Sequence, residues 1–150
     1  MMNNVSKLYE VYINRELQIK QNEVLNTTRL QQKILSFIHD LSEVADQSRC
    51  YLFWEKKEPV NHKQLLENYL DGLTMLMSIG YELKIDSIKN YTEIPEKKDI
   101  LSQFFKIYHS ILKVQQNYSS DAYQNTIDDY FTLGFMLGID TDEILDHYAK

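Results

Sequence analysis

The sequence predicts an all-α protein, a bundle of five to six helices that forms one domain over residues 1–150. Its 150 residues include only 4 Gly and 2 Pro, too few for an all-β sandwich or barrel with its frequent turns. Apolar residues recur at three- and four-residue spacing along most of the chain, which is typical of amphipathic helices. Hydrophobic residues make up 43% and charged residues 25%, the proportions of an ordered globular chain.

Three helices are expected in the first part of the chain. Asn3 and Asn4 open an apolar pattern over residues 5–17, and Thr27 and Thr28 precede a second pattern over residues 30–45. The second pattern is apolar over much of its circumference, so this helix is expected to be central. The period breaks between Ser48 and His62, and a third helical pattern then covers residues 65–83.

Three more helices are expected in the second part. Pro95 and the charges around it indicate a long connection before a fourth helical pattern over residues 100–114. Ser119, Ser120 and Asp121 resemble an N-terminal cap, from which a fifth helix runs toward Gly134 and Gly138. Residues 140–143, with the sequence Asp-Thr-Asp-Glu, are expected to cap a short last helix that ends at Lys150.

Composition excludes several classes of protein. The formal net charge of −6 and a pI of about 5.2 argue against a nucleic-acid partner. No apolar run approaches the roughly 18–20 residues of a membrane span, and no signal peptide is visible, so we expect a cytoplasmic protein. Cys50 alone makes neither an intramolecular disulfide nor a thiolate metal site. No motif of nucleophilic catalysis occurs, and the scattered histidines are expected at the surface or at caps: His39, His62, His109 and His147.

Acidic residues at three-residue spacing stand within two of the apolar patterns. Asp40 and Glu43 belong to the second expected helix, and Asn68 and Asp71, with Glu67 beside them, to the third. Residues three apart share one face of a helix, so antiparallel packing would bring both pairs to one point. Oxygen ligands gathered in this way suit Mg²⁺, which in turn bridges substrate phosphates. The alternative is that these side chains flank the apolar stripe and are solvated.

Several segments, in this order, resemble the all-helical dimeric dUTPases, which belong with the MazG-type enzymes to the all-α nucleoside triphosphate pyrophosphohydrolases. The resemblance extends from about Leu8 to Tyr148. The matching segments are Asp40-Leu-Ser-Glu43-Val-Ala, Phe53-Trp54-Glu-Lys-Lys, Leu66-Glu-Asn-Tyr-Leu-Asp71-Gly-Leu, Ser78-Ile-Gly-Tyr-Glu-Leu, Phe131-Thr-Leu-Gly-Phe-Met-Leu-Gly-Ile and Asp142-Glu-Ile-Leu-Asp-His-Tyr. The family's E-x-x-E and E-x-x-D motifs, which hold Mg²⁺, correspond to the two acidic pairs.

The resemblance implies a hydrolase of nucleotide metabolism, a homodimer that cleaves dUTP to dUMP and pyrophosphate with Mg²⁺ or Mn²⁺. Glu43 would position or deprotonate the attacking water. The implied metal ligands are Asp40, Glu43, Asn68 and Asp71, with Glu67 as a substitute from the neighbouring position.

Four residues are candidates for substrate binding. Asn14 lies near a position where the family usually has a glutamine that touches the base. Trp54 can form one wall of a base pocket because aromatic faces stack on nucleobases; the alternative is a core or interface anchor. Lys56 and Lys57 can meet phosphates, or belong to a solvated charge cluster.

Departures from the family pattern lead to two further hypotheses. Asp40 replaces a glutamate, Asn68 replaces the first acid of E-x-x-D, and the chain stops at Lys150, before the family's basic tail. Leu52 and Thr74 replace a lysine and a histidine. Together these changes predict weakened catalysis or an altered substrate. The chain is then a degenerate dimer with a binding or regulatory role, or a MazG-like pyrophosphatase of different base specificity.

A homodimer is also expected from the apolar patterns. The helices at residues 30–45 and 65–83 are apolar nearly all round, and one bundle of this size does not easily cover both faces. A second copy would bury the excess.

Overall fold

A computed structural model describes residues 5–19, 26–56, 58–89 and 99–149, and side chains from residue 15 to 19 are not described. Within these ranges the chain forms helices and no strands, which confirms the all-α class. The helices are α1 (Val5–Ile19), α2 (Thr27–Ser48), α3 (His62–Glu82), α4 (Ile100–Asn117), α5 (Ser120–Met136) and α6 (Thr141–Ala149). No helix in the described residues is long and apolar enough to cross a membrane.

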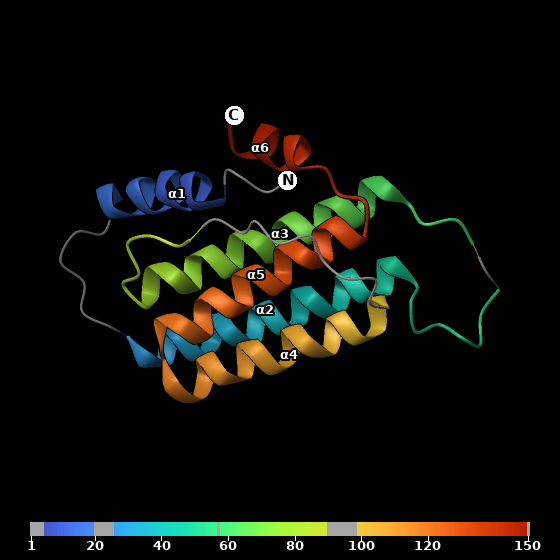
Figure 1. Ribbon diagram of the computed structural model, residues 1–150, viewed down its shortest axis with the longest axis horizontal. Helices are drawn as coiled ribbons and strands as arrows, with labels where there is room; N and C mark the ends of the chain where they lie inside the picture. The colour runs from blue at the N-terminus through green and yellow to red at the C-terminus, as the bar shows by residue number, and fades with distance from the viewer. Residues whose placement is uncertain (1–4, 20–25, 57, 90–98, 150) are drawn as a thin grey trace.

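Helices α2, α3, α4 and α5 form a four-helix bundle, with α1 and α6 on one side of it (Figure 1). The pair α2 and α3 is antiparallel, because the start of α2 meets the end of α3 through Arg29 and Glu82, whereas Glu43 meets Asn68 near the opposite ends. The pair α2 and α4 is antiparallel too. Two central antiparallel helices carry the acidic pairs, as the sequence predicts.

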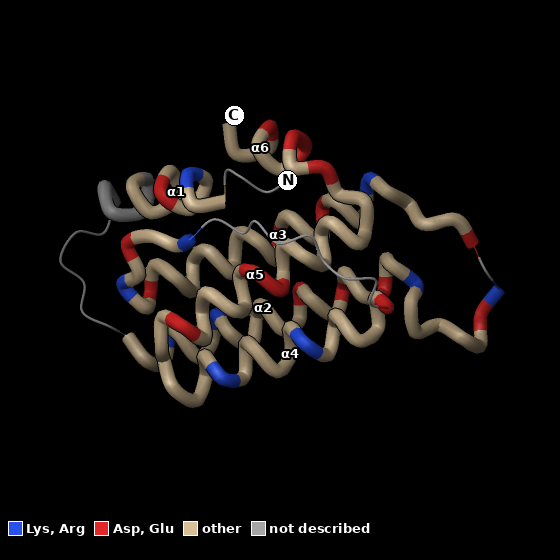
Figure 2. The backbone as a smooth tube through the Cα atoms, viewed as in Figure 1, with Lys and Arg blue, Asp and Glu red and all other residues tan. Residues whose placement is uncertain are grey.

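Local capping explains where the helices begin. The Ser119 side chain accepts a hydrogen bond from the Ala122 amide at 3.0 Å, which confirms the cap expected for α5. Asp140 caps α6 through the Asp142 amide at 3.0 Å, and Figure 2 shows acidic residues where that helix begins, next to the positive end of its dipole. The cap of α2 is Asn26, and Thr27 already lies within the first turn.

Four of the positions expected to mark ends or connections cannot be placed. Asn3, Asn4 and Pro95 lie outside the described residues, and so does Lys150. The described part of α6 ends at Ala149.

Tyrosine and glycine residues bring α3 and α5 close together. The Tyr69 hydroxyl donates to the Tyr130 carbonyl at 2.9 Å, and the Tyr130 hydroxyl donates to the Tyr69 carbonyl at 2.6 Å. The two rings stack with centroids 4.5 Å apart. Tyr130 packs against Gly72, and Tyr69 against Gly134, so a Cβ at either glycine would collide with the opposing ring. Each helix thus accepts, on a backbone carbonyl, a hydrogen bond from a tyrosine of the other helix. This reciprocal pair of hydrogen bonds fixes the register of α3 against α5.

Helices α1 and α6 add to the contacts that α2 and α5 make with α3. Tyr9 of α1 donates to the Ile85 carbonyl just beyond the end of α3 at 2.6 Å, and Tyr148 of α6 contacts Thr74 and the Leu70 carbonyl. None of the exposed large hydrophobic residues of the described chain belongs to α3. Apolar surface left for a partner therefore lies elsewhere than on this central helix.

Candidate functional site

The two acidic pairs meet between α2 and α3. The Asn68 amide nitrogen donates to Glu43 Oε2 at 2.9 Å. A Cβ placed on Gly72, the neighbour of Asp71, would lie 3.6 Å from Asp40 Cβ. This is an ordinary van der Waals distance, so α3 lies directly against α2 at Asp40. We call Asp40, Glu43, Asn68 and Asp71 the acidic cluster.

Carboxylates in the acidic cluster disturb one another. Burial, followed by the charges of Asp71 and Glu43, raises the pKa of Asp40, and His39 opposes the shift. Burial, followed by the charges of Glu43 and Glu67, raises the pKa of Asp71, and His147 of α6 opposes that shift. Groups that disfavour one another's charge at a half-exposed position are typical of functional sites, although structural networks also produce them.

Asn68 is the buried member of the acidic cluster, with 8% of its surface exposed. Its side-chain oxygen accepts a hydrogen bond from the Gln64 side chain at 3.0 Å, while its nitrogen faces Glu43. Gln64 lies one turn before Asn68 on α3, so the two amides form a short chain that ends on the carboxylate. In this arrangement Asn68 orients Glu43.

His39 joins the acidic cluster, although the sequence interpretation placed it among the scattered histidines. Its Nε2 lies 2.9 Å from Glu43 Oε1. One ligand atom each from His39, Asp40 and Glu43 can be chosen so that all three lie within 4.8 Å of one another. The signal that was available is the four-residue spacing of His39 and Glu43, which places both side chains on one helix face. A histidine considered without its neighbours carries no such signal.

The residues of this cluster suit a divalent cation. Carboxylate oxygens are the ligands of hard cations such as Mg²⁺ and Mn²⁺, and imidazole nitrogen adds affinity for later transition metals. A cation would also remove the mutual repulsion that raises the pKa values of Asp40 and Asp71. Glu67 is exposed and adds negative charge beside Asp71.

The residues expected to bind substrate lie on other elements. Asn14 is exposed on α1, and Lys56 is exposed in the loop after α2. Trp54 in the same loop is 61% exposed, which rules out a role in the core of this chain. Its ring meets that of Phe53 edge to face, with centroids 4.9 Å apart. Lys57 lies outside the described residues.

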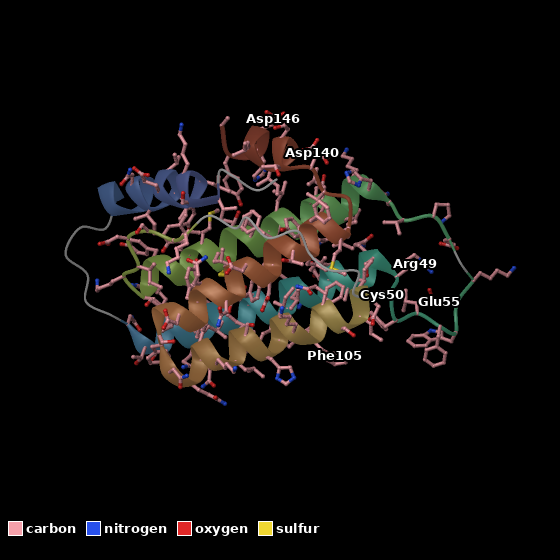
Figure 3. All side chains as sticks on the ribbon, viewed as in Figure 1. Arg49, Cys50, Glu55, Phe105, Asp140 and Asp146 are labelled. Atoms are coloured by element: carbon pink, nitrogen blue, oxygen red, sulfur yellow. The ribbon has the colours of Figure 1, made fainter. Side chains whose placement is uncertain are left out.

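The loop that carries Trp54 projects from the bundle after α2 (Figure 3). Arg49 ends α2 in a left-handed conformation, with φ of 60°, and pairs with Glu55 at 2.9 Å. This ion pair ties the first half of the loop to the end of α2. The loop thus presents an aromatic group outward rather than packing it on the bundle.

Comparison with known proteins gives one match. A family model described as dUTPase matches residues 4–150, which is nearly the whole chain. Searches of curated proteins and of solved structures gave no match. The described fold is all-helical, as in the all-α dUTPases, and the matched residues include both acidic pairs. The chain belongs to the dUTPase family.

Proposed function

We propose that the protein is a nucleotide pyrophosphohydrolase that cleaves dUTP to dUMP and pyrophosphate with Mg²⁺ or Mn²⁺. The observation that carries the proposal is the convergence of Asp40 and Glu43 with Asn68 and Asp71 between α2 and α3. The match to the dUTPase family supports it.

Each member of the acidic cluster has a proposed role. Asp40 and Asp71 hold the cation, with Glu67 close enough to contribute charge. Bound there, the cation would neutralise phosphate charge and lower the pKa of a bound water. Glu43 positions that water or takes its proton, and the contacts from His39 and Asn68 fix the direction of its carboxylate. Asn68 can itself serve as a ligand only by turning its oxygen away from Gln64.

The substrate-binding roles are proposals too. The exposed ring of Trp54 can stack on a base, and Lys56 and Lys57 can meet phosphates, once the loop after α2 folds toward the acidic cluster. Asn14 of α1 would contact the base. Exposure of Trp54 supports this role, because a ring packed in the core could not reach a nucleotide.

Pyrophosphate release from dUTP tests the proposal. We expect saturable release that requires Mg²⁺ or Mn²⁺. Glu43→Gln should lower kcat by about 10²–10⁴-fold, the contribution of general acid-base catalysis. Asp71→Asn should abolish or strongly lower release because it removes a proposed ligand of the cation. Asp121→Asn, which removes an exposed carboxylate at the start of α5, is the matched control and should keep wild-type turnover. The proposal fails if none of the common nucleotides is cleaved with either metal.

One observation favours a second candidate function. Asn68 supplies an amide where the family motif has an acid, and this amide is already engaged by Gln64 and Glu43. A chain with one acid fewer can bind a metal-nucleotide complex without turning it over, as a binding or regulatory protein. Tight binding of Mg²⁺–dUTP by calorimetry without pyrophosphate release would favour this candidate. Release from another nucleotide would instead indicate MazG-like base specificity.

We also propose a homodimer formed through α2 and α4. Leu101, Phe105 and Leu112 of α4 are exposed, and Leu35 of α2 is exposed as well. Their four- and seven-residue spacing on α4 makes a stripe along one face. A groove of about 380 Å³ continues this surface between the end of α2 and the start of α4, and it includes Phe105.

Light scattering tests the dimer. The wild-type mass should be about twice 17.9 kDa, and Phe105→Glu should return it to one chain, because a charge in the stripe would be buried without a partner. Val11→Glu changes an exposed apolar residue of α1, across the bundle from α4 (Figure 1), and should leave the dimer intact. A wild-type monomer contradicts the proposal.

A cytoplasmic place of action completes the proposal. Cys50 is a free, half-buried thiol, as is usual in a reducing compartment. Cell fractionation checks this directly.

A further inference from the structure

Glu43 is held from both sides. His39 Nε2 lies 2.9 Å from its Oε1 atom, and the Asn68 amide nitrogen lies 2.9 Å from its Oε2 atom. His39 is 70% exposed by its side chain and Glu43 is 42% exposed. Asn68, by contrast, is buried beneath the carboxylate. The imidazole therefore lies on the solvent side of Glu43, and the amide on the protein side.

The orientation of the Asn68 amide follows from its two neighbours. Its nitrogen donates to Glu43, and its oxygen accepts from Gln64. The reverse orientation would set two oxygen acceptors against each other at the Glu43 contact. A buried polar group that loses such a contact destabilises the folded protein. The Asn68 nitrogen therefore donates to Glu43, and the Asn68 oxygen faces Gln64 rather than the solvent.

The contact between His39 and Glu43 has the dimensions of two ligands of one cation. Metal bonds of about 2.1 Å that meet at a right angle place their ligand atoms about 3 Å apart. The observed separation of His39 Nε2 and Glu43 Oε1 is 2.9 Å. Asp40 supplies a third ligand atom within 4.8 Å of both. A cation bound to both atoms would lie beside the line that joins them, about 2.1 Å from each.

We propose that His39 is a ligand of the cation, together with Asp40 and Glu43. The proposal rests on the proposed metal-dependent function. Asn68, supported by Gln64, is then a positioning residue for Glu43. A set of carboxylates with one imidazole favours Co²⁺ or Zn²⁺ over Mg²⁺, because imidazole nitrogen suits later transition metals.

Calorimetric titration with Co²⁺ and with Mg²⁺ tests the ligand. His39→Gln should weaken Co²⁺ binding by at least about tenfold, since even outer-shell partners of a metal ligand contribute this much, and should reduce the preference for Co²⁺ over Mg²⁺. His109→Gln removes another exposed histidine, on α4, and is the matched control with unchanged affinities. His147→Gln tests the alternative that His147 is the ligand, because the charge of His147 opposes the rise in the pKa of Asp71.

Imidazole ¹⁵N resonances identify the ligand without reference to activity. On addition of Zn²⁺, the His39 ring resonance, assigned by its absence in His39→Gln, should shift more than those of the other histidines. Metal binding with an unmoved His39 resonance, or with a shift at His147 alone, overturns the inference and leaves the proposed function standing. Failure to bind any of these cations, together with no pyrophosphate release, overturns both.

Discussion

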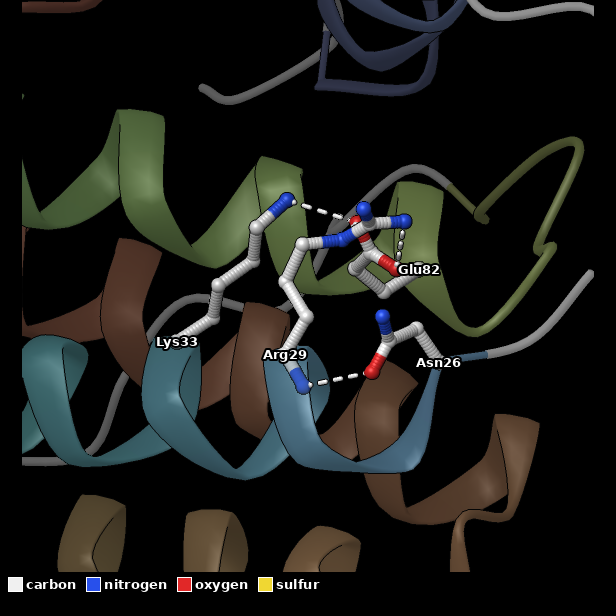
Figure 4. A network of polar contacts seen from close by, with 4 residues as sticks. All are labelled: Asn26, Arg29, Lys33 and Glu82. Carbon is white, nitrogen blue, oxygen red and sulfur yellow. Dashed lines mark hydrogen bonds and ion pairs between the residues drawn. The ribbon is translucent and has the colours of Figure 1, made fainter. Parts of the chain in front are cut away.

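Carboxylates at the two ends of the α2–α3 pair have opposite surroundings, cations at one end and further acids at the other. At one end, Glu82 is 3% exposed and meets Arg29 at 2.6 Å and Lys33 at 2.9 Å (Figure 4). At the other end, Asp40 and Asp71 face further acids. Burial by itself raises the pKa of Glu82, but the hydrogen bonds and charges of Arg29 and Lys33 outweigh it and lower the pKa. The pKa values of Asp40 and Asp71 are instead raised.

This difference distinguishes a carboxylate that is paired within the protein from carboxylates that remain available to a ligand. The carboxylate of Glu82 is satisfied within the protein, so it contributes to stability and has little capacity left for another cation. The acidic cluster keeps unbalanced negative charge at the surface, which costs stability in the absence of a cation. Under the proposed function, a bound cation would balance this charge.

Removing the charge of Glu82 should have the largest effect on stability. Glu82→Gln leaves the amide without the ion pairs to Arg29 and Lys33, and the free energy of unfolding at pH 7 should fall by about 2–3 kcal/mol, since both cations are partly exposed. Because the pKa of Glu82 is lowered from 4.5, its stabilisation is present above pH 4.5 and is lost as pH falls through the lowered value. Urea unfolding of wild type and variant at several pH values measures both effects. If the difference in unfolding free energy between wild type and Glu82→Gln stayed constant down to the pH of acid unfolding, the ion pairs would be contradicted.

Alanine substitution at Gly72 or Gly80 should distinguish a loss of stability through packing from a loss of metal affinity. Each added Cβ would collide with a tyrosine hydroxyl, that of Tyr130 at Gly72 and those of Tyr9 and Tyr123 at Gly80. Overpacking, less the gain in helix propensity, should cost about 1–2 kcal/mol in both variants.

Only Gly72→Ala should also weaken metal binding, because Gly72 adjoins Asp40 and Asp71. Gly80→Ala is its control near the Glu82 end of α3. Equal loss of metal affinity in the two variants would show that the acidic cluster is not locally positioned by Gly72.

Removing one acid of the cluster should have the smallest effect, with the opposite sign. Asp71→Asn relieves repulsion with Glu67 and Glu43 and should stabilise the metal-free protein by about 0.5 kcal/mol at pH 7. Since the pKa of Asp71 is raised from 3.8, the repulsion fades as pH falls through the raised value, and the difference between the proteins should shrink.

Added Mn²⁺ should reverse the order of stability, since it binds the folded wild type more tightly than the variant. Thermal unfolding with and without Mn²⁺ measures this, with the exposed Glu10→Gln as control. If Asp71→Asn is less stable than wild type when no metal is present, the acidic cluster does not carry unbalanced charge.

Much of the fold could be predicted because helices are specified locally. The apolar spacing around Leu30 and Leu65 predicts α2 and α3, and the side chain of Ser119 caps α5 as expected. Helix α2 begins at Thr27, before the apolar pattern that starts at residue 30, because Asn26 is a stronger cap than Thr27 or Thr28. The positions of the acidic pairs follow from the same helical period.

Other features could not be predicted because they depend on contacts between distant segments. Reciprocal hydrogen bonds between Tyr69 and Tyr130 join residues 61 positions apart. The covering of α3 by α1 and α6 also depends on such contacts, and it leaves the exposed apolar stripe on α4 instead. Periodicity identifies an apolar face and does not say which element will cover it.

The sequence by itself determined an all-α bundle of five to six helices, the pairing of acids at three-residue spacing and membership of an all-α family, because each depends on residues close together in the chain. Tertiary structure decided which acids are neutralised. Glu43 and Glu82 belong to the same helix pair, yet only Glu82 lies across from Arg29 and Lys33. It also decided that Asn68 of α3 faces Glu43 of α2. Electrostatic interaction depends on distance through space, and packing alone sets that distance.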